Sequence, residues 1–414
     1  MRFGRGLFGR RKSGGDAYAA FGLRALAIVR AQPSIAGAEF DADEFVIICG
    51  THDGAVYRIG LITPLRRAEG APEAVANEML ERYLLNMIAA PGRDESEWST
   101  VAPRLRPVIR QAGELAVRVE GMSVAENTLW RPVLPCLMER VVIDSPTAMK
   151  TVTPQDLAEW GVDAETVFAT ARNNMAELAY ATVSDFDPAQ EELLYLPDED
   201  GELYAGALPL VSGWLSSLGS KSGARPLVFV PGSTGVFMGL ATSPERVAQL
   251  VGVALRMYDE APRQVSPIPY TLDAEGRLVP FTVPRDHPAW ETIRVAESSL
   301  AAEVYGRQYE GLHADSEEGR IDYFVAELLH LRAEDGTEMT ATAWTDGVPT
   351  LLPRVHQVGM VDLDTGVIVD VPWDVLAREI ALEPVPGLFP VRYGVEFHPD
   401  EQVMARLAAA ASMS

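Results

Sequence analysis

The 414-residue chain is predicted to be an α+β protein of two domains, with mainly antiparallel sheets packed by helices. Three observations predict this class. Short apolar segments recur in pairs around turns that contain Asp and Gly, which is typical of β-hairpins. Amphipathic segments with helical spacing follow these pairs in both halves of the chain. The length also exceeds what one ordinary hydrophobic core organises, so two domains are expected.

The composition indicates a globular chain. Apolar residues make up 47%, mean hydropathy is +0.02, and no apolar run approaches the ~20 residues of a membrane span. The net charge of −24 would repel a phosphate backbone, so the acidic body is not expected to bind nucleic acid and favours solubility or a basic partner. Cys49 and Cys136 are expected to be buried thiols of a reducing cytoplasm, with a single disulfide as the alternative.

Residues 1–16 form a basic tail that contrasts with the rest of the chain. Its cations are Arg2, Arg5, Arg10, Arg11 and Lys12, and apolar residues stand between them. We favour a disordered, solvated tail that lacks the apolar stretch of a secretory signal. Contact of residues 1–12 with an anionic membrane surface or RNA is the alternative.

The first domain is predicted to span residues 17–283. It begins with a helix that ends at Pro33, followed by a hairpin of Phe45–Cys49 and Val56–Leu61. A helix beginning at Pro72 and strands within 105–110 and 133–143 come next. Two capped helices then follow, one from Thr153 to Trp160 and one from Asp163 to Leu178.

Strand and turn signals are densest between residues 193 and 240. The predicted elements are an apolar run (Leu193–Leu196), an acidic turn (Asp198–Gly201), a helix (Ala205–Leu218), and strands Pro226–Val230 and Val236–Leu240 around the turn Pro231–Gly235. A helix from Ser243 to Tyr258 and paired strands within 268–283 complete this domain.

The second domain is predicted to span residues 284–414 and to be acidic and rich in hairpins. A helix from Ala289 to Gln308 leads to a polar linker, Gly311–Gly319. An alternating strand at 339–344 precedes a hairpin of His356–Val361 and Val367–Val371. Helices at 373–380 and 400–410 close the chain.

Several segments, taken in order, resemble the YtpQ-like family of uncharacterised bacterial proteins over roughly Ala17 to Val283. They are Pro107–Arg110, Val152–Trp160 with Ala171 and Asn173-Asn174 beyond it, Asp200-Gly201 leading to Tyr204-Ala205, Val228–Pro231, and Val265–Pro267 through Leu278–Pro280. The chain departs from the family pattern after Pro231, where Gly232-Ser233-Thr234 replaces a bulkier polar or acidic residue. Because that family is a domain of unknown function, the resemblance implies a fold and a cytoplasmic bacterial setting, and no reaction.

The candidate contacts to a ligand or partner lie in three segments. They are Arg172, Asn173 and Asn174; Asp198 and Asp200; and Ser233 and Thr234. Consecutive asparagines on a helix indicate side chains that bond something specific, although a neighbouring loop backbone would satisfy them. The acidic turn lacks the twelve-residue calcium pattern, and the six histidines lack zinc-ligand spacing, so no metal or other cofactor is expected.

No motif identifies a catalytic residue. The Ser233 turn lacks the spacing of a nucleophile elbow and the lysine of a phosphate loop. The leading hypothesis is therefore a non-enzymatic protein-interaction or adaptor protein of the bacterial cytoplasm. The alternative is a hydrolase or small-ligand-binding enzyme whose pocket lies where the Asp198, Arg172 and Ser233 segments converge.

Overall fold

A computed structural model describes residues 15–42, 45–52, 56–61, 64–65, 68, 72–88, 97–119, 122–145, 149–191, 193–198, 203–233, 235–332 and 337–411. These residues confirm the predicted α+β class with mostly antiparallel sheets. The chain divides into two compact units, residues 1–95 with 144–150 and residues 96–143 with 151–414. The predicted boundary near Pro284 falls inside the second unit, because the helix that follows it contacts elements on both sides of that boundary. The predicted basic tail lies outside the described residues up to position 14.

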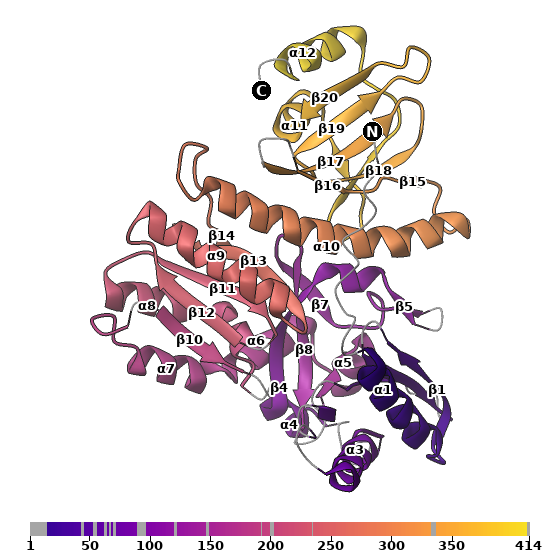
Figure 1. Cartoon of the computed structure of the whole chain (residues 1–414), viewed down its shortest axis with the longest axis vertical. Coiled ribbons are helices and arrows are strands. Elements are labelled where there is room, and N and C mark those ends of the chain that lie inside the picture. Colours follow the sequence, from indigo (N-terminus) through magenta and orange to yellow (C-terminus); the bar gives the residue numbers. More distant parts are fainter. Residues whose placement is uncertain are drawn as a thin grey trace. The chain divides into compact units, whose positions relative to one another are not determined.

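The described residues of the first unit include a three-stranded antiparallel sheet and the helices α1 and α3 (Figure 1). Its elements are α1 (Gly15–Arg30), β1 (Ile35–Asp41), β2 (Val46–Thr51), β3 (Val56–Gly60) and α3 (Glu73–Ile88). Strand β2 pairs with both β1 and β3, which confirms the predicted hairpin of the second and third strands. Ile47 and Ile59 from the sheet and Leu80 and Leu84 from α3 are fully buried in one core.

The second unit begins with a four-stranded sheet, in which β4, β8 and β7 lie in that order and β9 also pairs with β8. The first elements of this unit are α4 (Trp98–Val101), η1 (Ala102–Arg104), β4 (Leu105–Gln111), η2 (Ala112–Ala116), β5 (Arg118–Val119), β6 (Met122–Ser123), β7 (Trp130–Leu134), β8 (Leu137–Asp144) and β9 (Met149–Thr151). Three helices follow: α5 (Pro154–Trp160), α6 (Ala164–Asn173) and α7 (Ala176–Asp185). Phe168 and Ala171 of α6 pack on Val141 and Ile143 of β8, so α6 covers one face of this sheet.

Both predicted helix caps are confirmed. The Thr153 hydroxyl accepts a hydrogen bond from the Asp156 amide in a capping box, and the Asp163 carboxylate accepts one from the Thr166 amide. The helix that Asp163 caps ends at Asn173, however, and α7 starts after Met175. The single helix predicted to reach Leu178 is therefore two.

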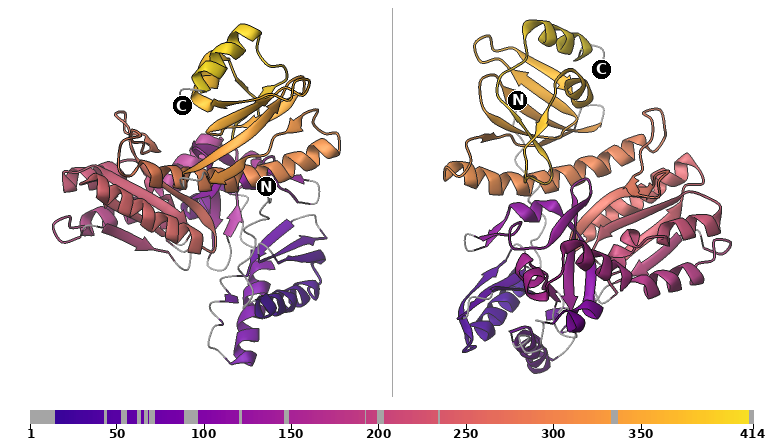
Figure 2. Two further views of the ribbon diagram at one scale, coloured as in Figure 1. Left: turned by 45° about the horizontal axis from the view of Figure 1, so that its top comes forward. Right: turned by 180° about the vertical axis from the view of Figure 1, so that it is seen from behind.

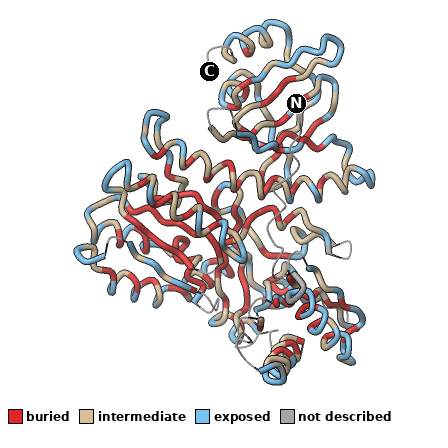
Figure 3. The backbone as a smooth tube through the Cα atoms, in the orientation of Figure 1, coloured by how far each residue is buried: buried red, intermediate tan, exposed pale blue. Residues whose placement is uncertain are grey.

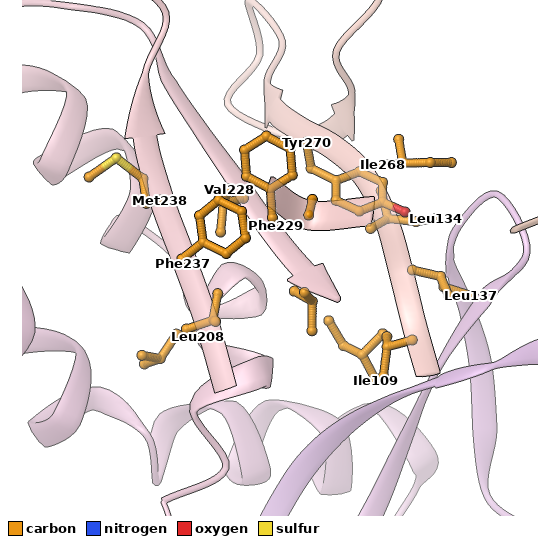
Figure 4. Packing of buried hydrophobic residues seen from close by; sticks show 14 of the residues in the cluster. Ile109, Leu134, Leu137, Leu208, Val228, Phe229, Phe237, Met238, Ile268 and Tyr270 are labelled. Carbon is orange, nitrogen blue, oxygen red and sulfur yellow. The ribbon is translucent and has the colours of Figure 1, made fainter. Parts of the chain in front are cut away.

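A five-stranded antiparallel sheet in the order β10-β12-β11-β13-β14 holds the largest core. Its elements are β10 (Leu193–Pro197), η3 (Ala205–Leu210), α8 (Trp214–Ser222), β11 (Pro226–Gly232), β12 (Gly235–Leu240), α9 (Pro244–Glu260), β13 (Gln264–Leu272) and β14 (Leu278–Pro280). Phe229 and Phe237 stack with ring centroids 4.6 Å apart (Figure 4). Ile109 and Leu137 join the same core, so it links this sheet to β4 and β8.

The helix predicted over Ala205–Leu218 is wrong in its extent. Residues 205–210 form a 3₁₀ helix that contains Pro209, and α8 begins only at Trp214. Pro209 lacks the amide that an α-helix interior requires, and Gly213 has a φ of +82°. These two residues interrupt the apolar pattern that predicted one helix.

The remainder of the second unit is built on α10 (Trp290–Glu317), which lies between the C-terminal sheets and the five-stranded sheet (Figure 2). The later elements are β15 (Phe324–Val325), β16 (Leu329–Arg332), β17 (Glu338–Thr345), β18 (Thr350–Pro353), β19 (Gln357–Val361), β20 (Ile368–Pro372), α11 (Trp373–Glu379), β21 (Glu383–Pro384), β22 (Arg392–Val395) and α12 (Glu401–Ala411). The predicted hairpin is confirmed as β19 and β20. Most of the predicted linker Gly311–Gly319 belongs to α10, because Leu312 is buried and extends its apolar contacts.

Burial follows the central strands of the sheets, and exposure rises toward their edges (Figure 3). All seven residues of β11 are buried, whereas β10 alternates between exposed and half-buried positions. Within the described ranges, no helix is both long enough and apolar enough to cross a bilayer.

Candidate functional site

Asp198 lies directly after β10 and is buried. Its Oδ1 accepts a hydrogen bond from the Leu203 amide at 3.0 Å, and its Oδ2 accepts one from the Ala205 amide at 3.1 Å. These bonds flank Tyr204, whose φ of +56° is uncommon for a residue with a Cβ atom. Asp198 therefore fixes the entry into η3, and both carboxylate oxygens are occupied by the backbone.

Ser233 forms the turn between β11 and β12, and its amide donates to the Arg263 carbonyl at 3.0 Å. Across the turn, Gly235 has a φ of +147°, and a Cβ atom there would lie 2.5 Å from the Leu196 carbonyl oxygen. Glycine is required at this position because the turn approaches the end of β10 so closely. Pro197 pairs with Gly235, so the Asp198 and Ser233 segments are neighbours.

Arg172 of α6 binds a buried glutamate on the sheet of β4, β8 and β7. Its Nε and Nη2 donate to the two oxygens of Glu139 at 2.7 and 2.6 Å, and the Glu139 side chain is fully buried. Arg131 donates to the same carboxylate at 2.6 Å and to Glu165 at 2.7 Å, with its guanidinium 4.1 Å from the centre of the Phe168 ring. We call Glu139, Arg131, Arg172 and Glu165 the Glu139 cluster. Its two arginines are balanced by two carboxylates.

The two asparagines behave differently from each other. The Asn174 side-chain amide donates to the carbonyls of Ala102 and Leu105 at 2.7 and 3.0 Å, so it bonds a neighbouring backbone. Asn173 is exposed. Among the described residues, no contact joins Arg172 or Asn174 to Asp198 or Ser233, so two of the three predicted segments are adjacent and the third belongs to the Glu139 cluster. Asp200 and Thr234 lie outside the described residues.

The opposite face of the same sheet carries a cluster that the sequence did not reveal. Glu114 in η2 accepts from Arg140 Nη1 and from Arg263 Nη2, both at 2.9 Å. Arg140 also donates to the hydroxyls of Thr151 and Thr128 at 3.3 and 3.5 Å. Arg110 of β4 is half-buried, and its side chain donates a hydrogen bond to the carbonyl of Ile109 at 2.8 Å. We call Glu114, Arg110, Arg140 and Arg263 the Glu114 cluster.

The pKa values of this cluster show how strongly its charges interact. Burial alone would raise the pKa of Glu114, but Arg263, Arg140 and Arg110 outweigh it and lower that pKa to about 2. The pKa of Arg110 falls to about 9, first because of burial and then because of the Arg263 cation, with Arg140 adding to the effect and Glu114 opposing it. The arginines therefore hold Glu114 ionised, and one carboxylate does not balance three cations.

Alternation along the strands explains the two faces. Glu139 and Arg140 are consecutive on β8, so their side chains point to opposite sides of the sheet. Arg110 sits opposite Met138 in the β4–β8 register, and Arg140 sits opposite Val108, which puts both arginines on one face. The sequence places Arg110 and Arg140 on two predicted strands, but Glu114 and Arg263 meet only in the folded chain.

A shallow groove of about 660 Å³ follows β10, at the edge of the five-stranded sheet. It is lined by Thr182, Asp185, Phe186, Glu191, residues 193–196 and Arg246. Leu193 and Tyr195, which share one face of the strand, are 38% and 46% exposed. Exposed apolar side chains on an edge strand are typical of a surface that pairs with another chain.

The described ranges contain no group of three His, Cys, Asp or Glu side chains that could hold a metal ion. Cys49 and Cys136 are free thiols, and burial raises their pKa values to about 11 and about 12, which disfavours the reactive thiolate.

Comparison with known proteins gives no match: no family model, no curated protein and no solved structure is similar to this chain. The resemblance to the YtpQ-like family therefore stays a prediction.

Proposed function

We propose that this chain is a protein-interaction or adaptor protein, and that an extended segment of its partner pairs with β10. The observation that carries the proposal is the edge position of β10 beside the groove. Strand β10 has β12 as its neighbour on one side, and no described strand pairs with the other. The peptide groups along such an edge are able to hydrogen-bond an added strand.

The side chains of β10 support an apolar, alternating partner. Leu193 and Tyr195 expose their side chains on one face, and Tyr and Leu side chains there offer contact area beyond the backbone hydrogen bonds. Asp185 and Glu191 line the same groove with Arg246, and the chain as a whole carries −24. We therefore infer a partner segment that alternates apolar residues with Lys or Arg.

The test is a selection of short random peptides by display on the full chain, followed by binding measurements on synthetic copies. The selected peptides are expected to alternate apolar and basic residues and to protect amides within residues 193–196 from hydrogen exchange. Replacing Leu193 and Tyr195 together by serine is expected to weaken binding about tenfold or more, because anchors at an interface dominate its energy.

Leu363 supplies the matched control. It is 74% exposed in the turn between β19 and β20, so Leu363→Ser removes a similar apolar surface elsewhere. Peptides whose affinity falls equally in both variants, or that leave the amides of β10 unprotected, would refute the proposal.

The contacts of the described residues favour this function over a hydrolase or small-ligand enzyme at the three predicted segments. Asp198 is occupied by two backbone amides, and Arg172 is occupied by Glu139. We further propose a cytoplasmic location, which the two free cysteines support. Membrane attachment through residues 1–12 is a separate hypothesis, and liposome flotation of the intact chain against a chain lacking those residues tests it.

A further inference from the structure

We propose that the Glu114 cluster is a binding site for a small oxyanion with at least two negative charges, such as a phosphate group or a dicarboxylate. The site is distinct from the β10 groove and does not depend on the function proposed for it. Its guanidinium groups come from β4, β8 and the segment that precedes β13. Three separate parts of the chain thus supply the arginines, and two of these arginines bind Glu114.

The distribution of partners within the cluster carries the inference. Glu114 uses one oxygen for Arg140 and the other for Arg263, both at 2.9 Å. Within the described part of the chain, Arg110 forms no salt bridge, and its one hydrogen bond goes to a neutral carbonyl. A half-buried guanidinium without a carboxylate of its own is costly, because burial removes water and the other two arginines repel it.

An oxyanion would relieve that cost. A guanidinium presents parallel N–H donors that match two oxygens of a phosphate or carboxylate. Three arginines gather around one glutamate here although the net charge of the chain is −24, so the cluster is positive in an acidic protein. The Arg263 side chain is half exposed, so this guanidinium is accessible from solvent.

The neighbouring segments would fix the shape of the site. Tyr204 lies near enough to affect the pKa of Arg110, and its backbone is held by Asp198. The carbonyl of Arg263 accepts from the amide of Ser233, which ties the arginine to the β11–β12 turn. The predicted residues Asp198 and Ser233 thus act here as positioning residues, which place Tyr204 and Arg263.

The experiment measures binding of inorganic phosphate and, in a second arm, malonate to the full chain by calorimetry at neutral pH. Sodium chloride holds the ionic strength constant, because exposed charges are screened by salt. Phosphate or malonate is expected to bind and to raise Tm, and chloride at matched ionic strength is expected to do neither. Preference for one of the two probes identifies the class of ligand.

Three variants tie the binding to the cluster. Arg110→Gln is expected to weaken binding at least tenfold, and the exposed Arg378→Gln on α11 is expected to leave it unchanged. Glu114→Gln removes the competing carboxylate and is expected to strengthen binding severalfold, a gain that a purely structural role would not produce. If Arg110→Gln fails to fold, the half-exposed Arg263→Gln is expected to show the same loss.

Two results would overturn the proposal. One is an equal response to phosphate, malonate and chloride at the same ionic strength. The other is binding that Arg110→Gln or Arg263→Gln reduces no more than Arg378→Gln does.

Discussion

The two faces of the sheet formed by β4, β8 and β7 each gather arginines around one glutamate, and they differ in how far carboxylates balance the positive charges. In the Glu139 cluster the carboxylate is fully buried, Arg172 binds it with two parallel hydrogen bonds, and Glu165 supplies a second carboxylate. In the Glu114 cluster the Glu114 side chain is 21% exposed and binds two arginines, and Arg110 adds a third positive charge that no carboxylate pairs within the described residues. The same residue types therefore produce a balanced group on one face and an excess of positive charge on the other.

The covering layer explains the difference. Helix α6 packs on the Glu139 face with Phe168 and Ala171, and the Glu139 side chain there is fully buried, so its charge must be paired inside the protein. The Glu114 face opens toward Arg263, whose side chain is half in solvent. A closed charged group holds the fold together, whereas an open, unbalanced one is suited to binding.

The largest expected effect is on the closed face. Glu139→Gln removes the buried charge and leaves Arg131 and Arg172 facing each other without it, which is expected to lower the free energy of unfolding by about 3–5 kcal/mol. Urea denaturation measures this loss. Glu165→Gln is the matched control, since that side chain is 76% exposed and its loss is expected to cost less than ~1 kcal/mol. Similar losses in the two variants would contradict the view that the Glu139 cluster is closed.

The second prediction concerns acid. Because the pKa of Glu114 is lowered from 4.5 to about 2, its ionised form stabilises the folded state above pH ~4.5. That stabilisation, at most about 3 kcal/mol, is expected to be lost as pH falls from ~4.5 through about 2. The free energy of unfolding, measured across this pH range, is expected to fall less steeply in Glu114→Gln than in the original chain. An unchanged slope would show that the arginines do not hold the carboxylate as described.

The titration of His356 must be separated from that of Glu114. The pKa of His356 falls from 6.5 to about 4, mainly by burial and then by the Arg294 cation. The neutral ring therefore stabilises the folded state above pH ~6.5, and this contribution, about 2 kcal/mol after allowing for partial exposure, is lost as pH falls through about 4. His356→Asn is expected to make the free energy of unfolding depend less on pH between 6.5 and 4. The loss below pH ~4.5 that comes from Glu114 is expected to remain. If the variant flattens the lower range instead, the assignment of the two groups is wrong.

Local signals predicted much of this fold, and long-range pairing did not follow from them. The Thr153 and Asp163 caps and the β2–β3 and β19–β20 hairpins depend on residues close in sequence, so turn and cap chemistry was enough. The pairing of β17 with β19 in parallel has no such signal.

The candidate site shows the same limit more sharply. Arg172 was predicted to contact a ligand or partner, and in the structure it binds Glu139, which lies 33 positions earlier. Glu114 and Arg263 are 149 positions apart and meet only because β13 packs beside the end of β4. No spacing rule connects such residues, so the Glu114 cluster could not be predicted from the sequence.

The smallest expected effect separates the two faces by one conservative change. Arg131→Lys loses the pair of guanidinium hydrogen bonds to Glu139 and Glu165 and the stacking on Phe168. This loss is expected to lower the free energy of unfolding by about 1 kcal/mol. Arg263→Lys keeps a cation beside Glu114 from a half-exposed position and is expected to stay within ~0.5 kcal/mol of the original chain.

Phosphate binding should rank the two lysine variants in the reverse order. Arg263→Lys gives up the parallel donors that fit an oxyanion and is expected to weaken binding severalfold, while Arg131→Lys, on the other face, leaves it unchanged. Denaturation and calorimetry on the same two proteins therefore test both halves of the comparison. If one variant loses more of both its unfolding free energy and its phosphate affinity, the two faces do not have separate roles in stability and binding. That result would indicate a single charged network across the sheet.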